Sequence, residues 1–90
     1  MTNYASVEAM TRMITSITKT IQAEQVVVES LRKDYQAVGL EWNDSQYEKL
    51  GPVIDDAVRE LSGNQAKLSE CIVRLQLLRT KLEEYLSTRL

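Results

Sequence analysis

Histidine is absent from this chain of 90 residues, and cysteine occurs once. Without histidine the chain cannot form a Cys2His2 zinc finger, a Glu-x-x-His di-iron bundle, or a catalytic site of the Cys-His or Ser-His-Asp type. A single cysteine cannot form a disulfide within the chain. The acidic residues Asp55, Asp56, Glu83 and Glu84 fall on expected solvent faces without a converging partner. We therefore expect a protein that is not an enzyme and that holds no metal and no cofactor.

An excess of basic charge and a long apolar run are also missing. Eleven Lys and Arg stand against thirteen Asp and Glu, so no basic surplus is available to neutralise nucleic-acid phosphates. No apolar run approaches the roughly 20 residues that a membrane span needs. The first residues lack the basic and apolar regions of a secretory signal. We expect no nucleic-acid partner, no membrane span, and a protein that is cytoplasmic and/or secreted without a cleavable signal peptide.

Helix breakers are scarce, since the chain has three glycines and one proline. None of them falls within residues 4–38 or 66–90. Strands need turns every several residues, so the scarcity of breakers favours an all-α fold. The length allows one domain, spanning residues 1–90.

Apolar residues recur at heptad spacing along residues 4–38, which predicts one amphipathic helix. The a positions are Val7, Ile14, Ile21, Val28 and Tyr35, and the d positions are Met10, Ile17, Glu24, Leu31 and Val38. Met13 and Val27 at g widen this stripe. The c positions are all small: Ala9, Ser16, Ala23, Ser30 and Ala37. They fit either a close-packed dimer seam or a helix-compatible surface, and we favour the seam.

A second heptad register runs along residues 44–88. Its a positions are Tyr47, Ile54, Leu61, Leu68, Leu75 and Leu82, its d positions are Leu50, Ala57, Asn64, Cys71, Leu78 and Tyr85, and Val58, Ile72 and Leu86 extend it at e. Because the register passes Pro52 and Gly63 without a slip, we favour one helix that is kinked near 52, with 63 as a second candidate position for a kink. The alternative is a short turn of helix followed by a main helix that begins with Pro52. Cys71 at d is expected to be a buried, unreactive thiol.

The stretch between the two registers predicts a short turn over residues 39–43. Gly39 suits a left-handed helix end, with Leu40 folding back on Tyr35. Asn43 suits the N-cap of the second helix, and Gln46 stands three residues later, as in a capping box. Trp42 and Tyr47 would then form a hydrophobic staple.

A short connection makes the helices antiparallel neighbours, and the wide apolar stripe calls for a further partner. We therefore predict a helix-turn-helix hairpin that dimerises into a four-helix bundle, with itself or with a homologous chain. The expected core and interface residues are Ile14, Ile17, Ile21, Val28, Leu31, Leu61, Leu68 and Leu75. Glu24 and Asn64 fall level with one another when the turn is centred near Trp42. We expect a polar layer there that fixes the register, with a functional notch as the less favoured interpretation.

The turn motif, Trp42-Asn43-Asp44, together with the length and the two long helices, resembles the WXG (Trp-X-Gly) superfamily of small type VII secretion proteins, also called early-secreted-antigen-like. Asp44 stands where the family has glycine. The family's Tyr-x-x-x-Asp/Glu export motif is not completed, since Arg89 follows Tyr85 at that spacing. The resemblance implies an exported substrate, or a partner or adaptor of a larger secreted effector, that acts by helix packing. The alternative is a cytoplasmic coiled-coil scaffold or a secretion chaperone unrelated to type VII export.

Overall fold

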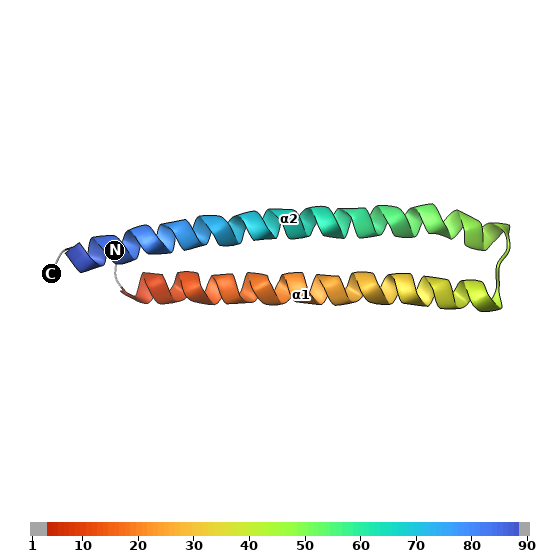
Figure 1. Cartoon of the computed structure of the whole chain (residues 1–90), viewed down its shortest axis with the longest axis horizontal. Coiled ribbons are helices and arrows are strands. Elements are labelled where there is room, and N and C mark those ends of the chain that lie inside the picture. Colours follow the sequence, from red (N-terminus) through yellow and green to blue (C-terminus); the bar gives the residue numbers. More distant parts are fainter. Residues whose placement is uncertain (1–3, 89–90) are drawn as a thin grey trace.

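The protein is an antiparallel hairpin of two long helices, described by a computed structural model over residues 4–88. Helix α1 spans Tyr4–Glu41 and helix α2 spans Ser45–Thr88. Residues 42–44 form the turn at one end of the rod, and the described chain begins and ends at the other (Figure 1). The structure confirms the predicted all-α helical hairpin, and no strand occurs within residues 4–88.

The hairpin is a thin rod. Its extents are 70 × 16 × 15 Å, and its radius of gyration is 20.3 Å. A compact domain of this length would have a radius of gyration of about 12 Å. As a result, only three apolar residues of the described part are buried, namely Ile17, Val58 and Leu82.

Helix α1 runs three residues further than the sequence indicates and ends at Glu41. The Trp42 N–H donates to the Val38 carbonyl at 2.8 Å, which continues the helical pattern past Gly39. No glycine of residues 4–88 has a positive φ, so the predicted left-handed ending at Gly39 is wrong. The predicted contact of Leu40 with Tyr35 is wrong too, because Leu40 is 89% exposed.

Helix α2 is continuous from Ser45 to Thr88, with Pro52 and Gly63 inside it. The alternative of a separate short helix before Pro52 is therefore not seen. Pro52 cannot donate a hydrogen bond to the carbonyl of Glu48. Both residues are exposed, so water can bind that carbonyl. The helix curves gently along its length (Figure 1).

Tyr35 and Tyr47 join the two helices beside the turn, and we call this pair the tyrosine clasp. The rings of Tyr35 and Tyr47 stack with centroids 4.4 Å apart and an interplanar angle of 9°. The Tyr47 hydroxyl donates to the Tyr35 carbonyl at 2.8 Å, and the Tyr35 hydroxyl donates to the Tyr47 carbonyl at 3.3 Å. Partial burial raises the pKa of Tyr35, and the hydrogen bond with Tyr47 and nearby negative charges raise it further. The clasp is thus reciprocal, with each hydroxyl donating to a backbone carbonyl of the other helix.

Two helical glycines make room for the tyrosine clasp. A Cβ on Gly39 would collide with the hydroxyl of Tyr47, and one on Gly51 would lie 2.9 Å from the hydroxyl of Tyr35. Each glycine stands four residues after a tyrosine, so the pattern Tyr-x-x-x-Gly occurs twice. Gly39 therefore serves close approach between helices and not helix termination.

The clasp also explains why α2 is rotated relative to the predicted register. Along α1 the less exposed side chains follow the expected a and d positions. Along α2 the helix-facing residues are the predicted a positions together with Gly51, Val58, Gln65, Ile72, Arg79 and Leu86. The predicted d positions are all exposed instead: Leu50, Ala57, Asn64, Cys71, Leu78 and Tyr85. Gly51 lies against the Tyr35 hydroxyl. The residues that come after Gly51 at heptad spacing therefore also face α1.

Candidate interaction surface

The rotation of α2 leaves apolar side chains uncovered along one side of the hairpin. On each helix, the residue one position before a helix-facing residue lies at the edge of the contact between the helices. In an antiparallel pair, these edge residues of both helices lie on the same side of the hairpin. We call this side the apolar face and define it by Met13, Val27, Leu50, Cys71, Leu78 and Tyr85. All six are exposed.

Two shallow grooves mark the apolar face near its two ends. The groove near the turn is lined by Leu31, Asp34, Tyr35, Val38, Leu50 and Ile54. The groove near the termini is lined by Met10, Leu78, Lys81, Leu82 and Tyr85. Each groove takes side chains from both helices, which shows that the flanks of α1 and α2 meet on this side.

Small residues border the apolar face on α1. The five predicted c positions are Ala9, Ser16, Ala23, Ser30 and Ala37, and all are exposed. They therefore do not pack against α2. Their short side chains leave the α1 backbone open to close approach from outside the hairpin.

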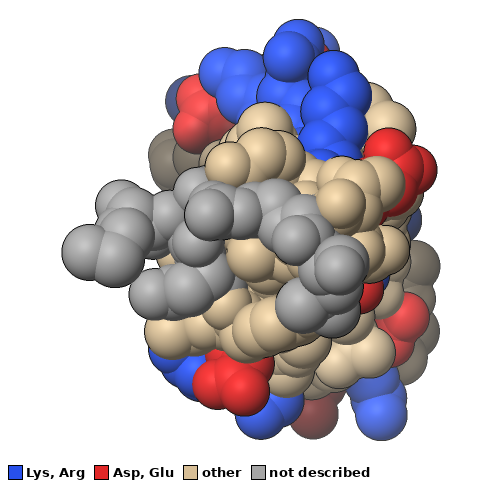
Figure 2. All heavy atoms as spheres, turned by 90° about the vertical axis from the view of Figure 1, so that its left-hand side faces the viewer, with Lys and Arg blue, Asp and Glu red and all other residues tan. Residues whose placement is uncertain are grey.

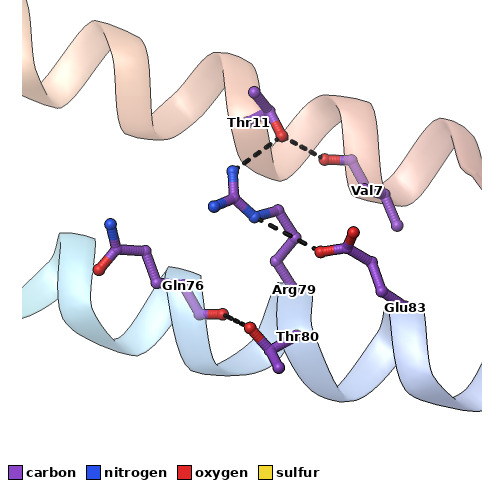
Figure 3. A network of polar contacts seen from close by, with 6 residues as sticks. All are labelled: Val7, Thr11, Gln76, Arg79, Thr80 and Glu83. Carbon is purple, nitrogen blue, oxygen red and sulfur yellow. Dashed lines mark hydrogen bonds and ion pairs between the residues drawn. The ribbon is translucent and has the colours of Figure 1, made fainter.

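The opposite side of the hairpin is polar. Arg79 reaches from α2 across to α1, where its Nη1 donates to Thr11 Oγ1 at 3.1 Å, and its Nε lies 3.7 Å from Glu83 Oε1 (Figure 3). Further along, a hollow on this side is lined mainly by polar groups, including Gln25, Arg32 and Ser62. A view along the rod from its open end shows Lys and Arg at opposite outer edges, with Asp and Glu also along the rim (Figure 2).

The predicted core residues line the contact between the helices. Ile17 is buried. The others are partly exposed, as expected for a pair of helices with no further layer: Ile14, Ile21, Val28, Leu31, Leu61, Leu68 and Leu75. Cys71 is a free, exposed cysteine, so the expectation of a buried thiol is wrong. The rotation that turns Ile72 towards α1 is what moves Cys71 outward.

The structure brings the predicted polar layer together. Asn64 Nδ2 donates to Glu24 Oε1 at 2.8 Å, across the contact between α1 and α2. The second carboxylate oxygen, Glu24 Oε2, is buried and has no hydrogen-bond partner among residues 4–88. Glu24 is partly exposed and Asn64 is exposed, so the layer reaches the surface.

The turn motif is built around Asp44. Its Oδ1 accepts from the backbone N–H groups of Gln46 and Tyr47, both at 3.0 Å, which makes Asp44 the N-cap of α2 in place of the predicted Asn43. Its Oδ2 accepts from the indole Nε1–H of Trp42 at 2.8 Å. The predicted staple between Trp42 and Tyr47 is wrong, because Trp42 is 67% exposed and Tyr47 stacks on Tyr35. The Asp44 carboxylate thus fixes both the start of α2 and the position of the indole.

Removal of the Asp44 cap should destabilise the hairpin in a pH-dependent way. The backbone N–H of Tyr47 lowers the pKa of Asp44 most, followed by the Trp42 indole, against a smaller opposing effect of partial burial. A carboxyl whose pKa is lower in the folded state stabilises the fold above its ordinary value of 3.8 and loses that effect as pH falls below it. Asp44→Ala should therefore lower the melting temperature at neutral pH by about 5 °C.

The matched variant is Asp44→Asn, since asparagine caps a helix without titrating. It should retain most of the neutral-pH stability and show a weaker decline in acid than the wild type. Circular dichroism melts across the acid range provide the comparison. Equal acid declines in the two proteins would contradict the assigned role of the carboxylate.

Comparison with known proteins gives no match among family models, curated proteins or solved structures. Within residues 4–88, no three His, Cys, Asp or Glu side chains converge in a way that would hold a metal ion. Neither helix of that range is apolar enough over a sufficient length to cross a membrane. The fold and surface define the class of the molecule, an elongated helical hairpin with one uncovered apolar face.

Proposed function

We propose that this chain is a small WXG-like type VII secretion protein, either an exported substrate or the partner of a larger secreted effector. It acts by packing its helices against a second helical chain, and it is not an enzyme. The observation that carries the proposal is the apolar face, which runs along both helices and which residues 4–88 leave exposed.

The amount of exposed surface supports a missing partner. The chain exposes 7047 Å². A compact monomer of 10.3 kDa would expose about 5,400 Å². The excess is larger than the roughly 800 Å² that each partner contributes to a standard interface. A four-helix bundle with a homologous hairpin would cover the face along the whole rod.

The Trp-Asn-Asp turn supports the type VII interpretation. It joins two helices of similar length, and it holds an exposed indole in a fixed position through Asp44. An exposed, oriented tryptophan is suited to contact with another protein once the bundle has formed. The usual export motif would require an acidic residue at 89, where the sequence has Arg89, which lies outside the described residues. A partner that supplies this motif is therefore part of the proposal.

Pairing is tested with two adjacent leucines of α2. Leu78 lies on the apolar face, whereas Leu77 points away from it, and they are 54% and 59% exposed. Leu78→Asp should abolish co-purification with the product of the adjacent reading frame, while Leu77→Asp should leave it intact. Both variants should remain helical by circular dichroism. Equal effects of the two substitutions would contradict the assignment of the face.

Export is tested by fractionation of the producing cells. Accumulation in the culture medium that depends on the type VII ATPase supports the proposal. Strict retention in the cytosol, with no effector bound, would instead support a cytoplasmic scaffold or a chaperone of another system. Both results are read against a cytosolic marker protein to exclude lysis.

A further inference from the structure

An unbalanced carboxylate interrupts the apolar face near the middle of the rod. Glu24 lies close to the centre of α1, and its partner Asn64 lies close to the centre of α2. Asn64 is a neutral donor, so it leaves the negative charge of Glu24 in place. No ion pair to Glu24 occurs in the described part of the chain, and its Oε2 is buried without a hydrogen bond.

The position of this charge disfavours pairing with a second copy. Glu24 and Asn64 lie within about 2–4 Å of the midpoints of their helices, at 1.5 Å per residue. Two fully overlapping hairpins would therefore bring their Glu24 layers to one level, whether they run parallel or antiparallel. Two carboxylates that lose water in the same interface repel one another and lack compensation.

The same charge favours a partner with a cation. A Lys or Arg on the incoming helix, level with Glu24, would balance the carboxylate while Asn64 keeps its hydrogen bond. The rest of the face is mainly apolar, with side chains such as Met13, Val27, Leu50 and Leu78. Asp34 and Lys81 are the charged residues that line its two grooves. A single polar layer of this kind is sufficient to select partners and register in helical bundles.

We infer that Glu24 directs the apolar face away from self-pairing and towards a different helical chain that carries a Lys or Arg at its mid-length. This inference rests on the proposed function, since it specifies the partner for the same face. It makes Glu24 the residue that determines partner specificity.

The first test removes the charge. Glu24→Gln retains the shape of the side chain and an acceptor for Asn64. In light scattering and sedimentation of the purified full chain, this variant should self-associate at least about tenfold more tightly than the wild type. The control is Glu29→Gln, which removes the same charge from an exposed residue of the same helix and should change nothing. A wild type that dimerises as tightly as Glu24→Gln would overturn the inference.

The second test supplies the cation. Wild type and a Glu24→Lys variant are measured separately and as an equimolar mixture. Each should associate weakly alone, whereas the mixture should form a species of twice the chain mass. A mixture that associates no better than its components would overturn the inference. Circular dichroism of each sample confirms that both chains are helical.

The outcomes separate the inference from the proposed function. Tight self-pairing that is indifferent to Glu24 removes the specificity role and leaves the bundle proposal intact. If the product of the adjacent reading frame binds neither the wild type nor Leu78→Asp, the bundle proposal fails. That measurement does not involve Glu24.

Discussion

Gly39→Ala should destabilise the hairpin by about 1–2 kcal/mol, although alanine is the better helix former by about 1 kcal/mol. The added Cβ would occupy the space of the Tyr47 hydroxyl. The ring must therefore leave its place, which breaks the stack on Tyr35 and the hydrogen bond to the Tyr35 carbonyl. The loss of these contacts exceeds the gain in helix propensity.

The matched control is Gly63→Ala, because nothing lies within 4 Å of a Cβ at that position. The same substitution in the interior of α2 should stabilise the chain by about 0.5–1 kcal/mol. Urea unfolding followed by circular dichroism measures both variants. In a Tyr47→Ala background the ring is gone, so Gly39→Ala should become stabilising. A stabilising effect of Gly39→Ala in the wild-type background would show that the clasp does not form.

Leu82→Ala should cost about 2–3 kcal/mol, the largest expected effect of a single truncation in α2. Leu82 is only 7% exposed, and it is one of three buried apolar residues of the described chain. A thin rod has little other buried surface to share the loss, and small proteins have only a few kcal/mol of net stability. We therefore expect the Leu82→Ala variant, in the absence of a partner chain, to be partly unfolded at room temperature.

Leu77→Ala is the control for this truncation, since it makes the same change five residues earlier in the same helix. Leu77 is 59% exposed, so its truncation should change stability by less than about 0.5 kcal/mol. Thermal and urea unfolding of the two variants at equal chain concentration provide the measurement. Similar losses for both leucines would contradict the assigned orientation of α2.

Local sequence signals located the helices well and the turn less well. The heptad spacing placed the a and d residues of α1 towards its partner, and the unbroken register of α2 indicated that the helix continues through Pro52 and Gly63. The N-cap was misplaced by one residue because Asn43 and Asp44 are both good caps. Gly39 was misjudged because a helical glycine and a helix-ending glycine look alike in sequence. The repeated Tyr-x-x-x-Gly pattern was the signal that could have found the clasp.

The sequence by itself determined that the chain forms two long amphipathic helices in one hairpin, and that Glu24 and Asn64 fall at one level. Periodicity and the scarcity of helix breakers are local properties, and they suffice for this. Only the tertiary structure decided which side of α2 faces α1, since its apolar stripe spans a, d and e positions and offers more than one fit. The choice follows from the packing of two tyrosines over two glycines across the turn, a contact between residues twelve apart. That packing leaves Leu50, Cys71 and Leu78 on the uncovered face.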